Sequence, residues 1–80
     1  MKPTYDLQYL DPFSLLVVGQ NGHLKRVYCP FYVISRFTES GFLQDQRVSV
    51  EMVKTITDNI IGYVIGGHVY PHEMFIIAFS

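Results

Sequence analysis

The sequence predicts an all-β domain, and three observations support this prediction. Residues that pack well on a pleated sheet dominate, since Val, Ile, Thr, Phe and Tyr make up 32 of the 80 residues. Strong helix formers are scarce, with one Ala, three Glu and three Lys. Short apolar stretches alternate with turn-forming residues along the chain. A chain of this length is too short for two independent cores, so we expect a single domain.

Residues 1–12 are interpreted as a lead-in segment, and residues 13–80 as the β-barrel-like domain. Pro3 and Pro12 bracket the lead-in, and Pro12 interrupts regular structure before the next segment. The lead-in is expected either to fray or to add a short edge strand through Leu7 to Leu10.

Residues 13–18 and 24–28 are expected to form a β-hairpin. The Asn21-Gly22 pair between them is a strong hairpin signal, because a type I′ turn needs positive φ at both central positions. Residues 15–18 are apolar in succession, so both faces of the first strand must avoid water. One face can meet the core, and the other needs the lead-in, the last strand or a second copy of the chain.

The middle of the chain predicts two further strands, at residues 31–37 and 47–55, with a loop between them. Cys29-Pro30 precedes the first of these strands and marks a bend. Its expected core face holds Phe31, Val33, Ser35 and Phe37. In the second strand, one face is expected to hold Val48, Val50 and Met52, and the other Ser49, Glu51 and Val53.

The last third of the chain predicts a hairpin, a helical turn and a closing strand. Asp58-Asn59 reads as a turn that leads into this part of the chain. The expected elements are a strand at 60–65, a tight turn at 66–67, a short strand at 68–70, one helical turn at 71–74 and a strand at 75–79.

A competing interpretation places a helix near residues 49–61, in an α+β fold. Ser49 is a suitable helix cap, and apolar residues recur behind it at helical spacing. However, eight of the fourteen residues from Val48 to Ile61 are β-branched, and Asp58-Asn59 suits a turn better than a helix interior. We therefore predict strands here and keep the helix as the alternative.

From Pro30 onward, the order of the expected elements resembles a small SH3-like barrel. The segments behind the resemblance are the strand PFYVISRF, the loop ESGFLQDQ, the strand RVSVEMV and the hairpin and turn YVIGGHVYPHEMF. They are similar to small SH3-like bacterial proteins whose function is mostly not established. The resemblance implies a small SH3-like barrel, to which the N-terminal β-hairpin is an addition, and a binding or scaffold role. It assigns no site residue.

Charge and cysteine content exclude several classes of protein. Six Lys and Arg against seven Asp and Glu give a net charge of −1, which argues against nucleic-acid binding held mainly by charge. Cys29 is the only cysteine, so the chain has no intramolecular disulfide and no cysteine pair for zinc. No apolar run reaches the roughly 18 residues of a membrane-spanning helix. The N-terminus also lacks a signal-peptide pattern, so we expect a cytoplasmic protein without membrane association.

Two groups of residues are weighed as sites of chemistry. His68 and His72 are four residues apart beside Glu73, but on one strand they would lie about 13 Å apart, too far for a single ion. Only a bend at Pro71 would bring them together. Cys29 lacks a local context for a nucleophile and is expected to be a small core residue. The sequence therefore predicts no catalytic residue, metal or cofactor, and a small metal-dependent enzyme is an unlikely alternative.

The predicted function is that of a non-catalytic binding or assembly module acting through protein–protein contacts. Twelve aromatic residues and sixteen Val and Ile are more than one small core can cover, so a protein partner or homo-oligomer is expected. The candidate interaction surface consists of Leu15, Val17, Lys25, Arg26, Tyr28 and Tyr32. The basic and aromatic members also suit a single-stranded nucleic-acid binder, which is one alternative. A phage or defence-related inhibitor is another.

Overall fold

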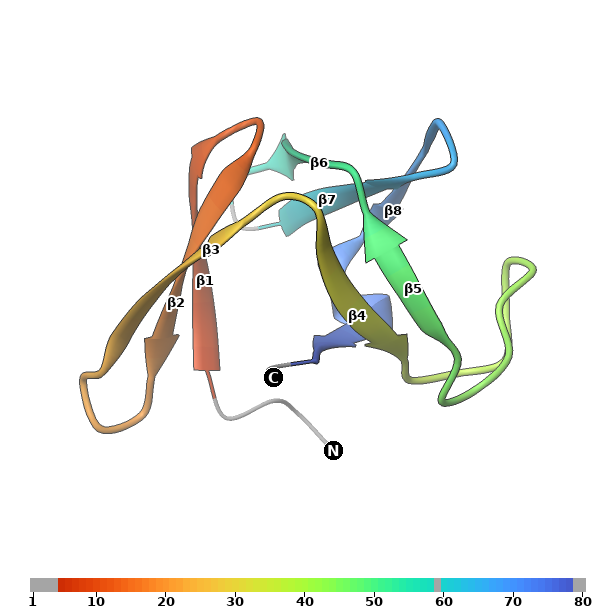
Figure 1. Cartoon of the computed structure of the whole chain (residues 1–80), viewed down its shortest axis with the longest axis horizontal. Coiled ribbons are helices and arrows are strands. Elements are labelled where there is room, and N and C mark those ends of the chain that lie inside the picture. Colours follow the sequence, from red (N-terminus) through yellow and green to blue (C-terminus); the bar gives the residue numbers. More distant parts are fainter. Residues whose placement is uncertain (1–4, 59, 79–80) are drawn as a thin grey trace.

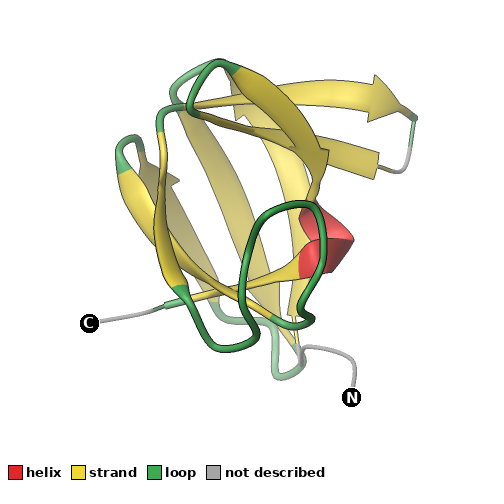
Figure 2. Cartoon of the chain, turned by 90° about the vertical axis from the view of Figure 1, so that its right-hand side faces the viewer, coloured by secondary structure: helices red, strands yellow, loops and turns green. Residues whose placement is uncertain are grey.

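The computed structural model describes residues 5–58 and 60–78, and most of these residues lie in strands (Figure 2). The strands are β1 (Tyr5–Asp11), β2 (Ser14–Gly19), β3 (Leu24–Tyr28), β4 (Phe31–Ser35), β5 (Arg47–Val50), β6 (Met52–Thr57), β7 (Ile60–Ile65), β8 (His68–Pro71) and β9 (Phe75–Ile77). A single-turn 3-10 helix, η1 (His72–Met74), precedes β9. The all-β prediction is confirmed. The alternative helix near residues 49–61 is wrong, because this segment forms parts of β5, β6 and β7.

The strands form three small antiparallel sheets, with the orders β1-β2-β3, β5-β4-β9 and β6-β7-β8. Figure 1 shows the first sheet as a long meander on one side of the molecule and the other two sheets beside it. Within the described residues the hydrogen-bonded ladders do not close into one barrel. No helix in these residues is long and apolar enough to span a membrane.

The described part of the lead-in forms the strand β1. β1 pairs with β2 from Tyr5 opposite Gly19 to Asp11 opposite Ser14, with a register shift before Asp11. At its start, the Tyr5 hydroxyl accepts the Ile77 backbone N–H at 2.9 Å, which joins β1 to β9. The strand is therefore longer than the expected segment from Leu7 to Leu10. Residues 1–4 lie outside the described residues.

The β2-β3 hairpin is confirmed, but its turn differs from the prediction. The loop holds residues 20–23, and the Gly19 N–H donates to the His23 carbonyl at 2.8 Å. Gly22 has a φ of 82°, whereas Asn21 does not adopt positive φ. A type I′ turn needs positive φ at both positions, so the expected turn type is wrong.

β4 buries the face that the sequence assigned to the core, but it ends earlier than expected. Phe31, Val33 and Ser35 are buried, while Phe37 follows the end of the strand and is exposed. Ser35 closes the following loop, because its N–H donates to the Gln46 carbonyl at 2.9 Å and its hydroxyl donates to the Phe37 carbonyl at 2.6 Å. The expected alternation through Phe37 therefore stops at Ser35.

The expected strand at residues 47–55 is divided in two at Glu51. β5 pairs with β4, whereas β6 pairs with β7, so the chain passes from one sheet to another at this residue. Val50 and Val53 are both fully buried. In one regular strand, residues three apart lie on opposite faces, so the side-chain alternation shifts at the break. The expected placement of Val50 and Val53 on opposite faces of one strand is therefore wrong, because both side chains enter the core.

All three sheets contribute to one apolar core. Tyr63 lies among its aromatic rings, with centroids 5.6 Å from Phe31 in an edge-on contact and 6.0 Å from Phe75. The buried members are Leu15, Val17, Phe31, Val33, Val50, Val53, Ile61, Tyr63, Met74, Phe75 and Ile77. Burial of each large apolar side chain contributes about 1.5–3 kcal/mol. The core therefore joins the N-terminal sheet to the rest of the molecule.

The first prediction concerns alkaline pH. Burial raises the pKa of the Tyr63 phenol above its usual value near 10. Because the folded state holds this proton more tightly than the unfolded state, the resulting stability is present below about pH 10 and is lost as the pH rises further. We expect the free energy of unfolding to fall less steeply above pH 10 in Tyr63→Phe than in the parent protein.

Urea denaturation at a series of alkaline pH values measures this difference. Tyr28→Phe is the matched control, because Tyr28 is 63% exposed. Burial also raises the pKa of Tyr5, so some alkaline loss persists in Tyr63→Phe. If the free energy of unfolding fell equally steeply with pH in Tyr63→Phe and Tyr28→Phe, the prediction would be contradicted.

Candidate functional site

The structure divides the predicted interaction residues into buried and exposed groups. Leu15 and Val17 are 0% and 4% exposed and belong to the core, so their assignment to an exposed surface is wrong. Lys25, Arg26 and Tyr28 are exposed on β3, as predicted. Tyr32 is also exposed, but it lies on β4 in a different sheet.

The correction at Leu15 and Val17 follows from the register of the N-terminal sheet. Leu15 lies opposite Val27, and Val17 lies opposite Leu7, both of which pack against the core. Because side chains alternate along a strand, Leu16 and Val18 lie on the opposite side of the sheet. The core side of β2 is thus occupied by Leu15 and Val17.

The side of the N-terminal sheet away from the core carries three neighbouring aliphatic residues followed by an arginine and a tyrosine, a set here named the outer face. In the register, Leu16 lies opposite Arg26 and Val18 lies opposite Leu24. Leu24 is 66% exposed and Tyr28 is 63% exposed. The outer face consists of Leu16, Val18, Leu24, Arg26 and Tyr28.

Sequence reasoning missed Leu16, Val18 and Leu24. Four apolar residues in succession carry no period, so the run at residues 15–18 does not indicate which pair faces the core. The usable signal was in the lead-in, where Tyr5, Leu7 and Tyr9 alternate with Asp6 and Gln8. With the observed register, that alternation places Leu15 and Val17 on the core side.

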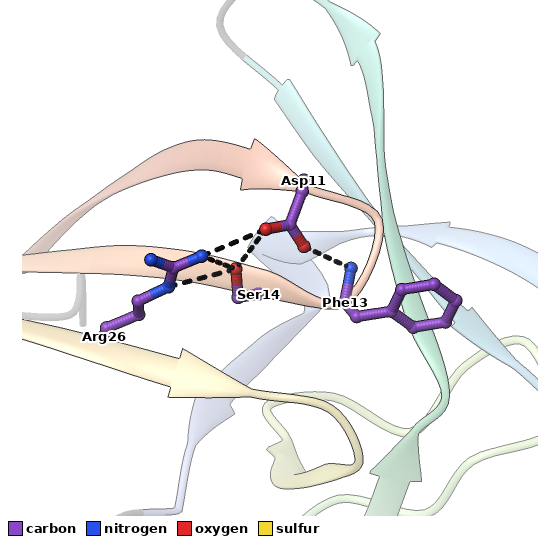
Figure 3. A network of polar contacts seen from close by, with 4 residues as sticks. All are labelled: Asp11, Phe13, Ser14 and Arg26. Carbon is purple, nitrogen blue, oxygen red and sulfur yellow. Dashed lines mark hydrogen bonds and ion pairs between the residues drawn. The ribbon is translucent and has the colours of Figure 1, made fainter.

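A polar network closes the turn between β1 and β2 and connects it to β3 (Figure 3). Asp11 accepts the Phe13 backbone N–H at 2.8 Å through Oδ1 and the Ser14 hydroxyl at 2.9 Å through Oδ2. The Arg26 Nη2 lies 3.0 Å from Asp11 Oδ2 and 3.0 Å from Ser14 Oγ. The network holds the Arg26 guanidinium in place on the outer face.

Arginine side chains lie over both tyrosine rings of the predicted interaction surface. Arg26 Cζ is 5.2 Å from the Tyr28 ring centroid, and Arg47 Cζ is 4.5 Å from that of Tyr32. Each ring therefore has one face in contact with a cation from its own chain. The two predicted tyrosines therefore lie in separate pairs on two sheets, and the partner of Tyr32, Arg47, was not among the predicted residues.

Cys29 has the properties of a structural residue. It is half-buried, its backbone N–H donates to the Phe13 carbonyl at 2.8 Å, and its peptide bond to Pro30 is cis. Burial, followed by the negative charge of Asp11, raises the pKa of its thiol. The thiolate is the reactive form of cysteine, so this environment disfavours nucleophilic chemistry.

The two histidines considered for metal binding have different surroundings. His72 Nδ1 lies 3.0 Å from the Ile61 nitrogen and 3.1 Å from the Ile61 oxygen. His68 lies on β8 with its ring centroid 6.4 Å from that of Tyr70. In residues 5–58 and 60–78, no three His, Cys, Asp or Glu side chains are grouped to hold a metal ion.

A cleft of about 950 Å³ lies between the N-terminal sheet and the rest of the molecule. One wall is residues 5–9 of β1, and another is the end of β6 at Thr55 and Thr57 together with Asp58, which follows the strand. η1 contributes His72 and Glu73. The volume of the cleft is within the range of ligand pockets. The cleft combines residues far apart in the sequence, and no sequence motif indicated it.

No protein-family model, curated protein or solved structure matches this chain. A functional interpretation therefore rests on the surfaces and the cleft described above.

The second prediction tests the turn network. Asp11→Ala removes both acceptor oxygens, whereas Asp11→Asn keeps one, so we expect the alanine variant to unfold at the lower temperature. The Phe13 N–H, then the Ser14 hydroxyl, hold the pKa of Asp11 below its usual value of 3.8. Because the folded-state pKa is depressed, this stability is present above about pH 3.8 and is lost as the pH falls further.

Thermal unfolding at neutral pH and at several acidic pH values measures both effects. The advantage of the parent protein over each variant should shrink in acid. Identical unfolding temperatures for all three proteins at neutral pH would show that the network does not stabilise the turn.

Proposed function

We propose that this chain is a non-catalytic binding or assembly module that acts through protein–protein contacts of its outer face. The observation that carries the proposal is the position of Leu24 next to Val18 and close to Leu16, on the side of the sheet away from the core. Leu24 is 66% exposed, so a partner can bury most of its side chain. The partner is another protein or a second copy of the chain.

The composition of the outer face supports a protein partner. Full burial of each exposed aliphatic side chain contributes about 1.5–3 kcal/mol, and Tyr and Arg are frequent anchors of protein interfaces. Tyr28 and Arg26 lie at one end of the outer face as such a pair. The Asp11 network already holds Arg26 in place, which lowers the entropy lost when it is buried.

Nucleic acid is a less suitable partner for the same surface. The Arg26 guanidinium is paired with the Asp11 carboxylate, which opposes binding of a phosphate at that point. Its position over Tyr28 also occupies one face of the ring that would stack on a base. We therefore favour the protein-binding function over the single-stranded nucleic-acid alternative.

We further propose an SH3-like arrangement for residues 31–78, with the N-terminal sheet as an addition. The pairing of β9 with β4 and the passage of the chain between sheets at Glu51 support it. The long loop between β4 and β5 and the 3-10 turn η1 before β9 also fit. Such a scaffold carries binding surfaces without a catalytic centre. The proposed location is the cytoplasm, consistent with Cys29 as the only cysteine.

The third prediction uses two leucines with almost equal exposure. Leu24 is 66% exposed on the outer face, and Leu43 is 67% exposed in the loop between β4 and β5. We expect Leu24→Glu to weaken self-association or partner binding by about tenfold or more, because it places a charge in an apolar interface. Leu43→Glu should leave binding unchanged.

Sedimentation over a range of concentrations measures self-association, and affinity capture with purification of the bound protein measures a different partner. Both variants should keep the parent unfolding temperature. Binding that is lost equally in both variants, or a protein that stays monomeric and captures no partner, would contradict the proposed function. A salt-dependent shift of a single-stranded oligonucleotide would favour the nucleic-acid alternative.

A further inference from the structure

β1 presents one edge to the cleft. Five consecutive residues of this strand, 5–9, line the cleft, although their side chains alternate between the two faces of the sheet. A strand that met the cleft with one face would contribute every second residue. The backbone of β1 therefore borders the cleft.

The register identifies the backbone groups on that edge. The Gly19 N–H donates to His23 and the Cys29 N–H donates to Phe13, so the odd-numbered residues of β2 direct their backbone groups toward β3. The backbone groups of the even-numbered residues Leu16 and Val18 therefore pair with those of Gln8 and Asp6 in β1. Consequently Leu7 and Tyr9 direct their N–H and C=O groups away from β2. Within the described residues, these groups have no backbone partner.

β6 offers a second edge on the other side of the cleft. The Val53 N–H donates to the Pro12 carbonyl at 2.8 Å and thus points away from β7. Thr55 is two residues further along and directs its backbone to the same side. β1 and β6 therefore meet near Pro12 and Val53, and the cleft lies beyond this junction.

The lining of the cleft favours a positively charged ligand group. Asp6, Asp58 and Glu73 are acidic residues of the lining, against one cation, Arg36. The Asp6 side chain shares the Val18 side of the sheet, so Asp58 and Glu73 are the two carboxylates on the other side. The Arg36 guanidinium donates through Nη1 to the Glu73 carbonyl oxygen at 2.9 Å, which holds it against η1. These three acidic residues and Arg36 together carry a net charge of −2. Tyr9 adds a ring on which a cation can lie.

We propose that the cleft binds an extended peptide carrying a Lys or Arg side chain, which pairs with the open edge of β1 as an added strand. Strand addition satisfies the backbone groups of Leu7 and Tyr9, and the basic side chain lies near the carboxylates of Asp58 and Glu73. This site is separate from the outer face, because it uses the edge of β1 on the core side of the molecule. The proposal therefore stands or falls independently of the function proposed for the outer face.

The fourth prediction is tested by selecting a random nonapeptide library against the full chain. Selected peptides should contain Lys or Arg, and their binding should fall about tenfold or more in the triple variant Asp6→Asn, Asp58→Asn, Glu73→Gln. The matched control is Glu39→Gln, Asp45→Asn, Glu51→Gln, which removes the same charge outside the cleft lining. It should retain binding, as should Leu24→Glu on the outer face.

Backbone methylation of a selected peptide tests the strand pairing directly. N-methyl groups at alternate residues facing β1 should abolish binding, whereas those at the intervening residues should have little effect. Hydrogen exchange of the Leu7 and Tyr9 amides should slow in the complex. The proposal is overturned if no peptide is selected, if both triple variants bind equally, or if methylation at both sets of positions has the same effect.

Discussion

The side-chain alternation of β2 is the constraint on which both binding surfaces depend. Four apolar residues follow one another in this strand, and a β-strand can direct only every second one into the core. Leu15 and Val17 occupy the core, so Leu16 and Val18 face outward next to Leu24. The same register directs the backbone groups of β1 at Leu7 and Tyr9 toward the cleft. A shift of one residue would exchange the core and the outer face.

The rest of the molecule completes the core that β2 enters. The break at Glu51 lets one continuous stretch of chain contribute Val50 to one sheet and Val53 to another. Tyr63 and Phe75 fill the space between these sheets with aromatic rings. The bond from Ile77 to the Tyr5 hydroxyl then holds the beginning of β1 against the last strand. The N-terminal sheet is thus attached to the core through β2 and to β9 through β1.

Local patterns were sufficient to predict most of the strands, but not the features that depend on pairing. The bounds of β3 and β7 agree with the sequence interpretation, because turn residues flank both segments. The orientation of residues 15–18 was not predictable from β2 itself, since an unbroken apolar run has no period. The change of sheet at Glu51 and the cleft both arise from contacts between distant segments. Because the run at residues 15–18 has no period, two of the six predicted surface residues, Leu15 and Val17, were assigned to the wrong side of the sheet.

The orientation of β2 can be tested with two neighbouring leucines and one substitution. Leu15→Ser should lower the free energy of unfolding by about 2–5 kcal/mol, because Leu15 is fully buried in the core. Leu16→Ser should lower it by about 1 kcal/mol or less, because Leu16 lies on the outer face. Urea unfolding of both variants under the same conditions measures the difference. Equal losses, or a larger loss for Leu16→Ser, would contradict the register and with it both proposed binding surfaces.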